Sequence, residues 1–193
     1  MLSGKLVVGA IIAMTWLAGA ADASAAASAK QKEQARADVQ KMARETLERL
    51  YRAQPAAKAS VAKSAGYAVF SNFGMKIFVA GGGKGEGVAV DNKTRKATYM
   101  KMVEVQAGLG FGAKKFRLVW VFDSQKDFNN FVNSGYEFGG QASAAAKKGS
   151  QGSAYAGAVS VSPGVWLYQI TEEGLAAEIT AKGTKYYKND ELN

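Results

Sequence analysis

The spacing of apolar residues changes from a helical period to a strand period near residue 67, and this change limits what the chain can fold into. Upstream, apolar residues recur every three or four positions across residues 30–54, which predicts an amphipathic helix. Pro55 ends that helix and opens a second one over residues 56–65, which Gly66 is expected to cap. Downstream, short alternating segments rich in β-branched and aromatic residues predict strands.

The first predicted helix carries one apolar stripe. Its members are Val39, Met42, Ala43, Leu47, Leu50 and Tyr51. Charged residues fill the opposite face, as in helices that cover a core. Such a stripe either docks on the core of the domain or enters the interface of a membrane, and the sequence leaves both interpretations open.

The remainder of the chain predicts one antiparallel sheet with a single inserted helix. The predicted strands are residues 67–71, 76–81, 85–90, 97–103, 105–111, 115–122, 141–146, 153–161, 165–171, 175–181 and 184–187. Ser124 is placed to cap the inserted helix, with Asp127 three residues on, and Gly135 is placed to stop it. The predicted fold class is therefore α+β, with a barrel-like or sandwich-like β domain.

Residues 1–29 are typical of a cleaved export signal. Lys5 precedes an uncharged apolar run of about 16 residues, which is shorter than the ~20 needed to span a bilayer. Small-residue cleavage sites follow at residues 21–23 and 27–29. We therefore expect a periplasmic or secreted protein, associated peripherally with a membrane, with a helical lead-in over residues 30–60 and a β-rich domain over residues 61–193.

Two residue types are absent from the sequence, and their absence removes several kinds of chemistry. Without cysteine there is no disulfide, thiol nucleophile or cysteine zinc site, and without histidine there is no Ser-His-Asp triad and no imidazole metal ligand. The glycines of residues 81–87 lack the spacing of a phosphate-binding loop and suit close backbone approach in a strand. The sequence predicts a protein that is not an enzyme, with no catalytic residue, metal or cofactor.

The positive charge is the most informative functional signal. Lys and Arg total 25 against 16 Asp and Glu, a net charge of +9 that favours anionic partners. The candidate lipid-binding residues lie in or beside predicted strands: Lys76, Lys84, Lys101, Lys114, Lys115, Arg117, Lys147 and Lys148. If they share a face, they suit an anionic phospholipid membrane. The alternatives are a solvated surface or the acidic face of an envelope protein, and no nucleic-acid partner is expected because no recognised binding motif is present.

An ordered set of segments resembles the SYLF domain family. The segments are residues 65–72 (AGYAVFSN), 81–90 (GGGKGEGVAV), 105–112 (VQAGLGFG), 119–123 followed by a helix, 139–145 (GGQASAA) and 173–178 (EGLAAE). Their order and spacing match along residues 61–185, which is nearly all of the chain after the predicted signal.

The resemblance implies a lipid-binding module. In that family, eukaryotic members bind phosphoinositides, some associate with actin filaments, and an N-terminal amphipathic helix contributes to membrane binding in some members. The predicted compartment offers neither phosphoinositides nor actin. The expectation for this chain is therefore binding of anionic phospholipid, with an envelope scaffold that meets an acidic protein as the alternative.

Overall fold

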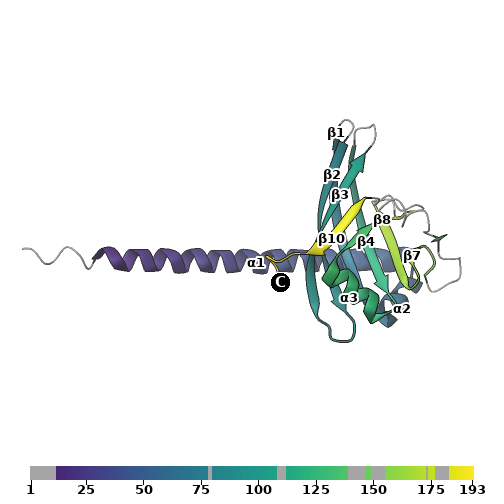
Figure 1. Cartoon of the computed structure of the whole chain (residues 1–193), viewed down its shortest axis with the longest axis horizontal. Helices are drawn as coiled ribbons and strands as arrows, with labels where there is room; N and C mark the ends of the chain where they lie inside the picture. The colour runs from purple at the N-terminus through teal and green to yellow at the C-terminus, as the bar shows by residue number, and fades with distance from the viewer. Residues whose placement is uncertain are drawn as a thin grey trace, which may run out of the picture.

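A computed structural model describes the backbone of residues 12–77, 80–107, 112–138, 147–148, 155–172, 174–176 and 183–193. It describes the side chains of residues 28–71, 84–103, 116–137, 155–172, 174–176 and 183–193. Within these ranges the chain forms three helices and one curled antiparallel sheet (Figure 1). The predicted α+β class and barrel-like β domain are confirmed.

Two helices precede the sheet. Helix α1 (Ile12–Ala53) is about 63 Å long, starts well before the predicted residue 30 and extends far beyond the sheet at its N-terminal end (Figure 1). Helix α2 (Ala56–Lys63) follows Pro55 and ends at Ser64 in an extended conformation. The predicted capping role of Gly66 is wrong, because this residue begins the first strand. A Cβ atom there would lie 2.5 Å from the Phe128 ring, so glycine serves close packing instead.

The sheet contains ten described strands, all paired antiparallel. Their bounds are β1 Gly66–Ile77, β2 Ala80–Asp91, β3 Ala97–Ala107, β4 Gly112–Phe122, β5 Tyr136–Phe138, β6 Lys147–Lys148, β7 Val159–Ser162, β8 Val165–Thr171, β9 Gly174–Leu175 and β10 Thr184–Lys188. The order across the sheet is β5-β10-β3-β2-β1-β4-β8-β7-β6, and β9 pairs with β8. The long neighbours β1 to β4 form its centre.

The first hairpin corrects two strand predictions. The predicted strand over residues 76–81 crosses from the end of β1 into the start of β2, so it is wrong. The strand predicted over residues 67–71 is too short, because Asn72 and Gly74 pair with Gly85 and Gly83 inside one continuous ladder. The register explains the difference, because glycines opposite one another still form ladder hydrogen bonds. Likewise β3 continues to Ala107, beyond the predicted end at residue 103.

The later strands agree in part with the predictions. The strand predicted over residues 165–171 is confirmed at both ends as β8. The strand predicted over residues 153–161 is found only at its end, as β7, because residues 155–157 form a turn. The strand predicted over residues 141–146, and most of the one over residues 175–181, lie outside the described residues.

Helix α3 (Gln125–Ser134) covers one face of the sheet. Its start is confirmed, because the Asp127 backbone N–H donates to Ser124 Oγ at 3.1 Å. Its end is confirmed too, because Gly135 adopts a positive φ of 75°. The buried core on this side is rich in aromatic rings: Phe70, Phe116, Trp120, Phe122, Phe128, Phe131 and Tyr186. Their edge-to-face and tilted contacts fix α3 against the strands.

Helices α1 and α2 cover the opposite face. Val39, Ala43 and Leu50 of α1 are buried there, together with Ala57 and Val61 of α2. They pack on side chains that alternate with the first core along the same strands: Val69, Val88, Tyr99, Val119, Val121, Tyr168 and Ile170. Much of the sheet is therefore buried on both faces among the described residues.

Candidate functional site

The strand register brings three of the predicted lysines to one end of the sheet. Lys114 lies opposite Gly74 and Lys115 opposite Phe73 in the β1–β4 ladder, while Lys76 lies opposite Gly112. This end is the one opposite to the β2–β3 connection, because β2 and β4 run antiparallel to β1. The backbone therefore places Lys76, Lys114 and Lys115 close together; their side chains lie outside the described residues.

Lys147 and Lys148 are placed elsewhere. They form β6, which pairs with β7 at one edge of the sheet through Ser160 and Val159. Their side chains also lie outside the described residues. The register separates them from Lys76, Lys114 and Lys115, because β7 and β8 lie between β6 and β4.

Arg117 and Lys101 both have partners within the protein. Arg117 donates from Nη1 to Thr46 Oγ1 at 3.2 Å, and the same nitrogen lies 3.7 Å from Glu45 Oε2. The guanidinium therefore links β4 to α1. Lys101 Nζ donates to Glu191 Oε2 at 3.0 Å, which neutralises it near the C-terminal end of the chain. These two cations stabilise the fold locally.

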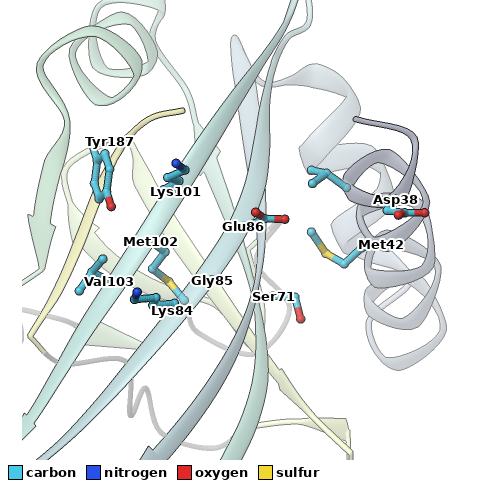
Figure 2. Close-up of a pocket in the computed structure, with 11 residues that line it drawn as sticks. Asp38, Met42, Ser71, Lys84, Gly85, Glu86, Lys101, Met102, Val103 and Tyr187 are labelled. Atoms are coloured by element: carbon cyan, nitrogen blue, oxygen red, sulfur yellow. The ribbon is translucent and has the colours of Figure 1, made fainter. Parts of the chain in front are cut away.

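A pocket of about 600 Å³ lies between α1 and the strands, and Lys84 stands in its wall (Figure 2). Asp38, Val39 and Met42 line it from α1, and Ser71, Lys84–Glu86, Lys101–Val103 and Tyr187 line it from β1, β2, β3 and β10. Of the predicted residues, the pocket unites Lys84 and Lys101. Its size falls in the range of small-molecule sites.

Sequence reasoning missed a second group of cations, at the end of the sheet where α2 meets the β2–β3 turn. Asn92 Nδ2 donates to Val61 O at 2.7 Å and to Ser64 O at 2.9 Å, so the turn is attached to the end of α2. We call this region the α2 corner. It contains four exposed cations: Lys63, Lys93, Arg95 and Lys96. The run NKTRK at residues 92–96 was the available signal, with three cations in five positions.

The turn of the α2 corner is held rigidly. The Arg95 N–H donates to Asp91 O at 2.8 Å, and the Asp91 N–H donates to Lys96 O at 3.0 Å. Arg95 has a φ of 62°, a conformation that residues other than glycine rarely adopt. Strained backbone of this kind persists where surrounding contacts hold it, and it is concentrated at functional sites.

Asp91 is the carboxylate within this turn. The Thr94 N–H donates to Asp91 Oδ1 at 2.7 Å, and Gln125 Nε2 donates to Asp91 Oδ2 at 2.7 Å. The backbone hydrogen bond from Thr94, aided by Gln125, lowers the pKa of Asp91 below its usual value. The carboxylate therefore stays ionised in mild acid and braces the turn that presents the three cations.

The apolar stripe of α1 is used for docking. Val39, Ala43 and Leu50 are buried, and Met42, Leu47 and Tyr51 pack against the same cluster. Gln40 Nε2 donates to Tyr99 Oη at 2.7 Å, which adds a polar contact to this interface. The docking interpretation is confirmed, and the docked helix does not offer this stripe to a membrane.

The described residues contain neither a metal-binding cluster nor a membrane-spanning helix. Among them, no group of three or more Asp and Glu residues is arranged to hold a metal ion. In the same ranges, no helix is both long enough and apolar enough to cross a bilayer. The cationic corner and the amphipathic pocket can each bind a ligand without a reacting group.

The chain is similar in sequence to known proteins. A family model described as "Ysc84: Las17-binding protein actin regulator" matches residues 103–193, a region that contains β4, α3 and every later element. The chain is also similar to the protein named "Beta cell expansion factor A" from Aeromonas veronii, with 34% identity over 165 residues. That match covers 84% of this chain and 60% of the relative, so the chain spans about three fifths of the relative's length.

Proposed function

Because the chain belongs to the SYLF family, in which actin-binding and lipid-binding domains are known, we propose that it is a non-enzymatic, peripheral binder of anionic phospholipid. The net charge of +9 supports this proposal in general. The α2 corner supports it in particular, because Lys93, Arg95 and Lys96 are exposed on one hydrogen-bonded turn and Lys63 is exposed at the end of the adjoining helix. Each cation near an anionic membrane surface contributes about 1 kcal/mol to binding.

The proposal also includes an exported location and a second candidate membrane surface. A chain exported by residues 1–29 would meet phospholipid head groups on the envelope side of a membrane. Lys76, Lys114 and Lys115 form the second candidate surface, at the end of the sheet opposite the α2 corner. Charge-reversal variants distinguish the two surfaces, because only variants of the surface that contacts the membrane should lose vesicle binding.

Flotation with vesicles tests the function directly. We expect binding to vesicles that contain phosphatidylglycerol and much weaker binding to vesicles of phosphatidylcholine alone. Binding should fall between about 0.1 M and about 1 M salt, because the Debye length shortens from ~10 Å to ~3 Å. Equal binding to both kinds of vesicle, or binding to neither, contradicts the proposal. In the second case, retention of an acidic envelope protein by the lipid-free domain would support the scaffold alternative.

The pH dependence of this binding is expected to be flat between about pH 5 and 8. The chain has no histidine, lysines and arginines remain charged in this range, and the pKa of Asp91 is lowered. Protonation of carboxylates therefore raises the net positive charge only in more acidic solution. Flotation on phosphatidylglycerol vesicles across this range measures the effect, and a steep change near pH 6.5 contradicts it.

A further inference from the structure

The pocket between α1 and the sheet contains apolar walls that the fold does not fill. Met42 projects from α1, and Val103 and Tyr187 lie on β3 and β10 across from it (Figure 2). Val39 of α1 also lines the pocket, although it is almost fully buried. Tyr187 is 37% exposed and is the one large hydrophobic side chain classed as exposed among the described residues. An exposed aromatic ring beside apolar walls suits contact with an apolar ligand.

Two opposite charges stand in the same pocket, two residues apart on β2. Lys84 and Glu86 are both exposed, and alternate residues of a strand lie on one face, with Cα atoms about 6.8 Å apart. Within the described part of the chain, neither side chain has an ion-pair partner. Lys101, which lies opposite Glu86 in the ladder, is bonded to Glu191 instead.

The fourth charged group of the pocket is the Asp38 carboxylate. Asp38 Oδ1 accepts a hydrogen bond from Gln34 Nε2 at 2.9 Å along α1. This amide is neutral, so among the described residues the pocket holds one cation, Lys84, and two carboxylates, Glu86 and Asp38, without an ion-pair partner. Lys84 and Glu86 lie side by side on β2. A purely anionic head group would face Lys84 favourably but would be repelled by Glu86.

We propose that this pocket binds a single-chain zwitterionic phospholipid, with the phosphate at Lys84, the ammonium at Glu86 and the acyl chain along Met42, Val103 and Tyr187. The charge pattern of the head group complements Lys84 and Glu86, and the acyl chain complements the apolar walls. This site binds one lipid molecule between α1 and the sheet. It is separate from the α2 corner and does not depend on binding to a membrane surface.

Titration calorimetry with lysophosphatidylethanolamine tests the site. The protein is the full chain after any signal cleavage, and the lipid is kept below its critical micelle concentration. We expect saturable binding of one lipid per protein, and weaker binding of lysophosphatidylglycerol with the same acyl chain. Absence of saturable binding to the folded protein overturns the proposal.

Two kinds of variant test recognition of the lipid head group and of the acyl chain separately. E86Q should weaken binding of lysophosphatidylethanolamine by about twofold to fivefold, the range of an exposed ion pair, without weakening binding of lysophosphatidylglycerol. V103W should fill the pocket and abolish binding of both lipids, whereas V103I should retain it. M42W fills the pocket from the opposite wall and replaces V103W if that variant fails to fold. Unchanged binding by a folded pocket-filling variant, or an equal effect of E86Q on both lipids, overturns the assignment.

The same variants distinguish this inference from the proposed membrane function. V103W does not change the net charge and leaves the α2 corner intact, so it should still float with phosphatidylglycerol vesicles. The variant K93E/K96E should still bind lysophosphatidylethanolamine in calorimetry. If the unchanged protein binds lysophosphatidylethanolamine but does not float with phosphatidylglycerol vesicles, membrane binding alone is contradicted. If it floats but shows no saturable lysolipid binding, the lipid pocket alone is contradicted.

Discussion

Reversing the three cations of the β2–β3 turn, in the variant K93E/R95E/K96E, is expected to weaken binding to phosphatidylglycerol vesicles by about 100-fold. Each cation near the membrane contributes about 1 kcal/mol, so removal of three corresponds to about 3 kcal/mol before any repulsion by the new carboxylates. All three side chains are exposed, so the fold should be retained. Vesicle titration measures the affinity, and a thermal unfolding curve checks the fold.

A charge-matched control separates position from total charge. K30E/K32E/K185E changes the net charge equally, but Lys32 lies about 30 Å along α1 from its C-terminal end, and Lys185 pairs with Val103, well along β3 from the turn. We expect a much smaller loss from this control. K114E/K115E tests the opposite end of the sheet. If it weakens binding more than K93E/R95E/K96E does, the membrane surface lies there and the assignment to the α2 corner is wrong.

Replacing Leu50 by alanine is expected to reduce the free energy of unfolding by about 2–5 kcal/mol. The Leu50 side chain has 0% exposure and lies between α1 and the sheet, so its truncation leaves a cavity in the second core. Chemical denaturation measures the loss. Arg49→Ala, the exposed neighbour on the same helix, should change the stability by less than about 0.5 kcal/mol.

The Leu50 variant also tests the docked position of α1. If α1 left the sheet in solution, Leu50 would be exposed in the folded state and its truncation would have little effect. Equal unfolding curves for Leu50→Ala and the unchanged protein would therefore contradict the docked arrangement. They would also restore the interpretation in which the apolar stripe enters a membrane.

Features set by neighbouring residues could be predicted from the sequence. Helix α3 begins at its Ser124 cap and ends at Gly135 because both signals act within one turn of the helix. The alternation along β4 can also be read directly from its sequence: Phe116, Leu118, Trp120 and Phe122 lie in one core, and Val119 and Val121 lie in the other.

Features set by distant residues could not be predicted. Glycine at residue 74 resembles a break until its partner Gly83 is known, because only the register shows that both belong to one ladder. Which of the candidate cations are free to bind a ligand could not be predicted for the same reason. Arg117 looked available as a strand cation, but Thr46 and Glu45, about seventy residues earlier, occupy its guanidinium. The α2 corner depends on Asn92 reaching Val61, which no local pattern indicates.

The hydrogen bonds that hold the β2–β3 turn affect the rates at which the protein binds to and leaves a membrane. Because Asp91, Thr94 and Asn92 already hold the loop in place, little chain entropy is lost on contact with a vesicle. Association is then governed by electrostatic steering, which is fast, and the absence of an inserted apolar anchor at the turn allows equally rapid departure. Molecules bound through this corner should exchange among vesicles and sample many membranes instead of residing on one.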